Sequence, residues 1–125
     1  MRKVPVLILL IIVLGLATLS FADSFTLFEK TATGAGAAQL LIQPLKDWTC
    51  QVNISAAADN VTVALEGGVT GISFGEMVNH DFTAAELANK TAFFSINGTP
   101  VKYVRGNLLS NPDNVTVKMS CIGAQ

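Results

Sequence analysis

Two stretches of this chain alternate apolar and polar residues, and each carries one of its two cysteines. Residues 48–54 read WTCQVNI, and residues 115–121 read VTVKMSC. A repeat of two is the pattern of a β-strand with one face buried, because successive side chains point to opposite faces. Cys50 and Cys121 fall on the apolar face. The pattern therefore predicts two half-buried strands whose cysteines point into the core.

Most of the remaining chain consists of short apolar runs separated by turn residues. Further strands are expected at residues 24–30, 37–43, 61–66, 71–77, 91–96 and 101–109. The intervening AAADN, NGTP and NPDN contain residues that favour tight turns. Only residues 83–90 suggest a helix, opened by a capping box of Thr83 and Glu86. About seven short strands in about 100 residues predict an all-β fold, an antiparallel β-sandwich with Greek-key or jelly-roll-like connections.

Residues 1–22 have the pattern of an export signal. Two basic residues precede an apolar run at 4–19, and Ser-Phe-Ala follows at 20–22. The alternative is an uncleaved membrane anchor, since roughly 20 apolar residues span a bilayer. Cleavage after Ala22 is favoured by the small residues there, and membrane contact is expected only through this segment if it stays. We expect a secreted protein, extracellular or periplasmic, with mobile N-terminal strands at 23–45 and a sandwich core at 46–125.

The two cysteines are expected to form a disulfide, because an exported chain meets oxidising conditions. Joining Cys50 to Cys121 closes a loop of about 70 residues, which the chain-entropy model values at about 4 kcal/mol. A nucleophilic cysteine needs a base, and His80 is the only histidine. A zinc site needs about four ligands, and two cysteines with one histidine make a poor set.

Charge and motifs exclude several functions. Without Arg2 and Lys3, six basic residues face nine acidic ones, so the net charge is −3 and nucleic-acid binding is not expected. No GxSxG, HExxH, CxxC or phosphate-loop motif occurs, so we expect no enzyme, no catalytic residue and no cofactor. The Asp and Asn residues at 59, 79, 81 and 113 could help to hold calcium at an edge of the sandwich, but turns require the same residues, and no metal site is expected. His80 is expected to be a solvated loop residue.

Five of the eight asparagines begin an Asn-x-Ser/Thr triplet, the acceptor pattern for N-glycosylation. They are Asn53, Asn60, Asn89, Asn97 and Asn114. The alternative is that these triplets have a structural origin. Asparagine often ends turns and Val-Thr often begins strands, so a β-structure alone can produce the Asn-x-Ser/Thr pattern. Candidate ligand contacts are Phe93, Tyr103 and Arg105. Phe93 and Phe94 are adjacent in one strand and must point to opposite faces, so one of them is a candidate aromatic platform.

Part of the chain resembles a known structural module. Leu65, Glu66 and Gly67 match the "VxLEG" strand of a small β-sandwich module of tailed-phage virion proteins, also found in secreted bacterial proteins. The run PVKYVR at 100–105 matches its "P-x-[KR]-Y-[VI]-R" strand, and a terminal VTV strand follows. The ending also looks like discoidin-type carbohydrate-binding sandwiches. The Asp-Gly and Trp of the module's first loop are missing here. The resemblance implies a sandwich without catalysis, in which Arg105 makes an ion pair across the strands or, alternatively, contacts a ligand.

We therefore expect a secreted, disulfide-stabilised, non-catalytic β-sandwich that acts as a structural or adhesive surface or filament subunit. In a filament, residues 25–43 would leave the domain and pair with an exposed edge of a neighbour. The alternatives are a carbohydrate-binding module of an exported protein and a virion-type structural protein. The expected partner is a protein, including a second copy, or a glycan.

Overall fold

The structure is a computed structural model and describes residues 21–125. The predicted export signal lies outside these residues except for its last two positions. The elements, in chain order, are β1 (Ala22–Lys30), β2 (Gly34–Ala35), β3 (Gln39–Leu45), β4 (Asp47–Ile54), β5 (Thr62–Gly68), β6 (Gly75–Asp81), α2 (Ala84–Asn89), β7 (Thr91–Ile96), β8 (Val101–Ser110) and β9 (Val117–Ala124). Within the described range, no helix is long and apolar enough to cross a bilayer.

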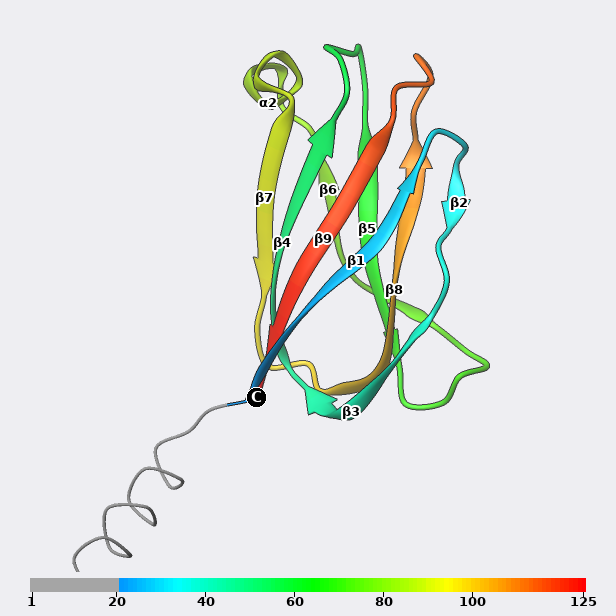
Figure 1. The fold of residues 1–125 in the computed structure, drawn as a ribbon, viewed down its shortest axis with the longest axis vertical. Helices are drawn as coiled ribbons and strands as arrows, with labels where there is room; N and C mark the ends of the chain where they lie inside the picture. Colours follow the sequence, from blue (N-terminus) through cyan, green and yellow to red (C-terminus); the bar gives the residue numbers. More distant parts are fainter. Residues whose placement is uncertain (1–20) are drawn as a thin grey trace, which may run out of the picture.

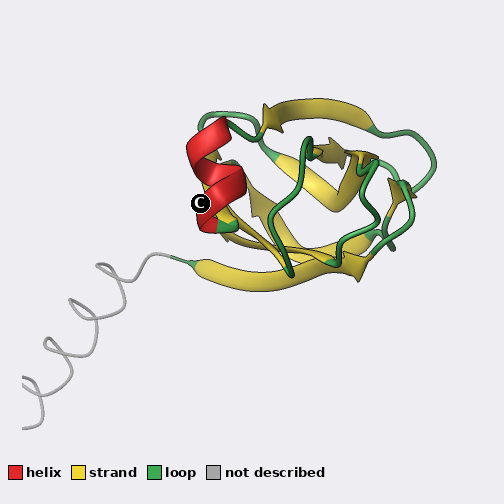
Figure 2. Ribbon diagram, turned by 90° about the horizontal axis from the view of Figure 1, so that it is seen from above, coloured by secondary structure: helices red, strands yellow, loops and turns green. Residues whose placement is uncertain are grey.

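The strands form two packed sheets, so the predicted antiparallel β-sandwich is confirmed (Figure 1, Figure 2). One sheet has four strands in the order β1-β9-β4-β7. The other has the order β2-β8-β5-β6, and β3 pairs with β8 as well. Every pairing is antiparallel. Residues 21–125 form nine strands where about seven were expected, because the segment before β4 is divided among three.

The core lies between the sheets and follows the alternation in the sequence. In β4 the buried positions are Trp48, Cys50, Val52 and Ile54, while the residues between them face solvent. The opposite sheet contributes buried residues of β5 and β8, among them Leu65, Val104 and Leu108. Burial of apolar side chains is the main term that favours such a fold, at about 25 cal/mol per Å² removed from water. The period-two pattern was therefore a correct guide to which faces meet.

The N-terminal strands are part of this sandwich. β1 pairs with β9 along nearly its whole length, and Leu27 and Phe28 are buried. β2 and β3 both pair with β8, and the side chain of Leu41 in β3 is buried. Residues 25–43 therefore complete the protein's own sheets in this structure.

The helix prediction was right in its details. Thr83 is the N-cap of α2, its hydroxyl accepts from the Glu86 N–H, and the Glu86 carboxylate accepts from the Thr83 N–H. Lys90 ends the helix in the left-handed region, with φ 64°. This reversal sends the chain directly into β7.

Two local predictions were wrong. The strand expected at 71–77 begins only at Gly75, because the chain turns through a loop between β5 and β6. Ile72, expected in that strand, lies in the loop with 92% of its surface exposed. His80 was expected in a solvated loop but lies in β6, opposite Val63 of β5.

Candidate contact surfaces

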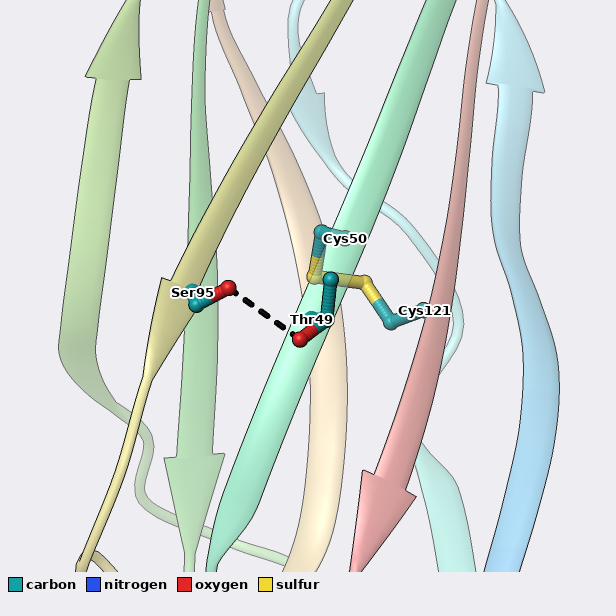
Figure 3. The surroundings of a disulfide bond; sticks show 4 residues. All are labelled: Thr49, Cys50, Ser95 and Cys121. Atoms are coloured by element: carbon teal, nitrogen blue, oxygen red, sulfur yellow. Dashed lines mark hydrogen bonds between the residues drawn. A yellow bond between two sulfur atoms is a disulfide. The ribbon is translucent and has the colours of Figure 1, made fainter.

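The predicted disulfide between Cys50 and Cys121 is present, and both residues are buried. It joins two neighbouring strands of one sheet, since the two cysteines lie directly opposite each other in the β4–β9 register (Figure 3). Their Cα atoms are 4.1 Å apart, which is the spacing of a non-hydrogen-bonded antiparallel pair. Residues 21–125 contain no free cysteine. This leaves no thiol in the described chain for nucleophilic chemistry.

A shallow groove of about 370 Å³ lies on the outer face of the four-stranded sheet. Its most exposed apolar side chains are Phe93, which is 60% exposed, and Ile122, which is 55% exposed. Small polar residues surround them, and Thr49 and Ser95 hydrogen-bond through their hydroxyls at 3.1 Å (Figure 3). The remaining lining comes from β1, β4 and β9: Ser24, Phe25, Thr26, Gln51, Ser120 and Cys121. Phe93 is thus the exposed member of the Phe93–Phe94 pair.

Arg105 lies on the opposite sheet and is engaged within the protein. Its Nε donates to Glu66 Oε1 at 2.6 Å, and its guanidinium lies 4.2 Å from the centre of the Phe74 ring. Asn107 Nδ2 donates to the other oxygen of Glu66 at 3.0 Å. The two motifs of the phage-module resemblance therefore meet in an ion pair between β5 and β8, the first of the two roles expected for Arg105.

The same contacts set the charge state of Glu66. Partial burial raises the pKa of this carboxyl, but the hydrogen bonds from Asn107 and Arg105 and the positive charge of Arg105 outweigh it. The pKa of Glu66 is therefore lowered from its ordinary value. The carboxylate is held ionised between its two donors.

The three candidate ligand residues do not converge on one site. Phe93 belongs to the groove on the four-stranded sheet, whereas Tyr103 and Arg105 lie on β8 of the other sheet. Tyr103 is half-buried beside the β5–β6 loop, where Gly71 packs against its ring. A single pocket built from these three side chains is thus absent from residues 21–125.

The sequence reasoning missed an apolar surface around Tyr103. Leu40 of β3 lies opposite Tyr103 in the sheet, and Ile42, two residues further on, is 83% exposed. The neighbouring β5–β6 loop exposes Ile72 at its tip. We call Leu40, Ile42, Ile72 and Tyr103 the β3 patch. The sequence does indicate this surface, because residues 40–42 are three consecutive apolar residues, LLI, and a strand can bury only alternate ones. Only the middle residue, Leu41, is buried.

His80 connects its own strand, β6, with α2 and β7. Its Nε2 lies 2.8 Å from Glu86 Oε1 of α2, and its ring stacks on Phe94 of β7 at 5.4 Å. Burial raises the pKa of Glu86, but hydrogen bonds from Thr83 and His80 outweigh it and lower the pKa overall. These contacts attach the short helix to the edge of both sheets.

The acidic residues of the loops make hydrogen bonds within the protein. Asp113 Oδ2 accepts the N–H of Asp59 at 2.6 Å and so joins two loops. No group of three or more His, Cys, Asp or Glu side chains within residues 21–125 is placed to share a metal ion.

All five candidate glycosylation asparagines are exposed. Asn53 lies on the outer face of β4, Asn89 ends α2, and Asn97 begins the turn between β7 and β8. Asn60 and Asn114 lie in loops at the same end of the sandwich as α2 (Figure 1). Glycosylation at these five asparagines stays a prediction.

Comparison with known proteins supports the fold. Neither the family models nor the curated proteins searched gave a match. Among solved structures, the SPBc2 prophage-derived protein YomS aligns over 86% of this chain and 96% of its own, with a TM-score of 0.52 and 15% identity. The expected likeness to phage proteins is thus supported for the fold. The discoidin-like ending stays a prediction.

Two further structures align with lower scores. The Yersinia pseudotuberculosis-derived mitogen YPM has a TM-score of 0.45 and 13% identity, with 85% of this chain and 86% of that chain covered. A structure of disulfide-linked pili from Bacillus endospore appendages has a TM-score of 0.44 and 10% identity, with 84% and 85% covered. Both are β-rich neighbours, and nothing about function is taken from them.

Proposed function

We propose that this chain is an exported, non-catalytic β-sandwich that acts by surface contact, as a structural or adhesive subunit. The observation that carries the proposal is the β3 patch. Its two isoleucines, Ile42 and Ile72, are 83% and 92% exposed, and Leu40, which lies opposite Tyr103, is 63% exposed. Contiguous exposed apolar side chains on a folded protein mark interaction surfaces.

Export is supported by the disulfide and by the segment at 1–22. A buried disulfide persists where the surroundings are oxidising. It stabilises a small domain that must survive without chaperones outside the cell. A contact role needs this kind of stable scaffold and no reactive side chain.

Analytical ultracentrifugation of the purified, oxidised protein over a wide concentration range tests the proposal. We expect assemblies larger than a dimer at high concentration, reduced in an Ile42→Ser/Ile72→Ser variant. The matched control is Leu109→Ser, which removes a similar exposed side chain from outside the patch. A monomer at every concentration would contradict the proposal. Intact mass of the same sample reports whether residues 1–22 are removed and whether sugar is present.

A carbohydrate-binding module is the second candidate, favoured by the groove on the four-stranded sheet. An exposed aromatic ring, Phe93, lies there among hydroxyl and amide side chains that can hydrogen-bond a sugar. A glycan array read with the wild type and with Phe93→Ala tests it. Binding that disappears in the variant supports this candidate, and no signal with or without calcium removes it.

A further inference from the structure

The strand β7 is the one sheet edge within residues 21–125 that lacks protection against pairing with another chain. Proteins block exposed edges with charge, proline, bulges or very short strands. The edge strands β1 and β6 are protected, because each has a bulge and charged residues. At the other edge of the five-stranded sheet, β3 contains Pro44 and pairs irregularly, and β2 is only two residues long. β7 reads TAFFSI, without charge or proline, and pairs with β4 without a register shift. Figure 1 shows it at the margin of its sheet, with α2 at the end where β7 begins.

The hydrogen-bonding groups on the open side of β7 can be assigned. Ile54 N–H donates to the Lys90 carbonyl at 3.0 Å, so even-numbered residues of β4 direct their backbone groups toward β7. The Cα atoms of Cys50 and Cys121 are close together, as in a pair that exchanges no backbone hydrogen bonds. The N–H and C=O groups of Cys50 therefore point away from β9 and toward β7, which gives the same assignment. In β7, the partners of these even residues are Ala92, Phe94 and Ile96.

The alternate residues Thr91, Phe93 and Ser95 therefore turn their N–H and C=O groups outward, away from β4. Within residues 21–125, no backbone hydrogen bond outside the β4–β7 ladder involves them. Unpaired donors and acceptors in this spacing are the template for another antiparallel strand. Phe93 stands at the middle of the three and carries the exposed ring.

We propose that β7 pairs with β7 of a second copy of this chain, antiparallel and centred on Phe93, so that two four-stranded sheets become one continuous sheet. This deepens the proposed function, on which it rests, by naming the partner and the interface. In this register each Phe93 lies beside the other, and their rings contact across the two-fold axis.

The sequence of β7 is complementary to itself in this register. Thr91 lies opposite Ser95 of the second copy, and Ala92 lies opposite Phe94, a small side chain against a large one. No like charges oppose one another along the strand. The same interface is therefore used by both copies, and it closes as a dimer.

Ultracentrifugation of Phe93→Lys and Ile122→Lys variants tests the interface. Both substitutions place a lysine on the same outer face at a similarly exposed position, but Ile122 lies on β9, away from the edge. We expect Ile122→Lys to dimerise like the wild type and Phe93→Lys to raise the dimer dissociation constant at least about tenfold, because two like charges would then lie opposite each other. Equal dimerisation of both variants, or equal loss, would overturn the proposal.

Cross-linking tests the register. Residues opposite each other in a hydrogen-bonded pair have Cα atoms about 5.5 Å apart, within the range of a disulfide. Phe93→Cys, oxidised with glutathione disulfide, is expected to form a covalent dimer, and Ser95→Cys is not, since Ser95 faces Thr91. A dimer from Ser95→Cys alone would refute the register.

The outcomes also separate this interface from the β3 patch. The Ile42→Ser/Ile72→Ser variant keeps the β7 dimer but loses larger assemblies if both proposals hold. Association that vanishes in the patch variant and persists in Phe93→Lys supports the contact function and overturns the β7 interface. A wild type that stays monomeric overturns both.

Discussion

Reduction of the Cys50–Cys121 disulfide should lower the free energy of unfolding by about 4 kcal/mol. The two cysteines are 71 positions apart, and the bond prevents the unfolded chain from exploring the conformations in which they separate. The chain-entropy model gives about 4 kcal/mol at 25 °C for a loop of this length. For a domain of about 100 residues, this corresponds to a fall in the thermal midpoint of roughly 15–30 °C.

The reduced protein should still fold, because the bond does not create the strand pairing that surrounds it. β4 and β9 are paired from Asp47 to Ile54, and β1 and β7 flank them on either side. The folded forms are thus expected to be alike, and the difference lies in the unfolded chain. A reduced unfolded chain is more open and exposes more surface, so the denaturant m-value should rise on reduction.

Equilibrium unfolding in guanidinium chloride measures both quantities. Trp48 is the only tryptophan and is almost fully buried, so its fluorescence reports loss of the core. A Cys50→Ala/Cys121→Ala variant is the control that separates the bond from the packing of the sulfur atoms. A loss below about 1 kcal/mol with an unchanged m-value would refute the unfolded-state reasoning. Full alkylation of both cysteines in denaturant without a reductant would refute the bond itself.

Three further predictions concern packing, a buried amide and charge. Gly123→Ala should destabilise the protein by about 1–3 kcal/mol, because a Cβ there would lie 2.7 Å from the Trp48 ring, whereas Gly75→Ala meets nothing within 4 Å and should be nearly neutral in thermal unfolding. Asn111→Ala should cost about 1–3 kcal/mol in denaturant unfolding, since its buried side-chain amide donates to two backbone carbonyls at 2.8 Å. The pKa of Glu66 is lowered by folding, so its stabilisation is present above the unfolded pKa and is lost as the pH falls through the folded one. The thermal midpoint should therefore fall less steeply with decreasing pH in Glu66→Gln than in the wild type, at pH values below the ordinary carboxyl pKa. The same fall of the thermal midpoint in both proteins would contradict this.

The sequence predicted what depends on neighbours along the chain. Alternation identified β4 and β9 and the inward direction of Cys50 and Cys121, and the capping box located α2. Each of these signals lies within a few residues, where side-chain direction and helix capping are decided.

What the sequence could not predict depends on which strands become neighbours. The cysteines could have bridged the two sheets, and only the order β9-β4 places them side by side within one. Ile72 seemed a strand residue because GISF is apolar, but Gly67 pairs with Gly75 and the residues between them must turn. TAFFSI reads as an ordinary strand, and its exposure as an unprotected edge follows only from its place at the margin of the sheet.

The candidate glycosylation sites and the β7 interface compete for the same region. Asn89 precedes β7 and Asn97 follows it, and in the register centred on Phe93 the Asn89 of one copy faces the Asn97 of the other. Asn53 lies opposite Thr91 on the adjacent strand. A glycan is bulky and hydrated, so sugar at any of these three would crowd the edge and keep β7 unpaired. The dimer is therefore expected only where these asparagines are unmodified, and enzymatic removal of the glycans from a glycosylated sample should restore it.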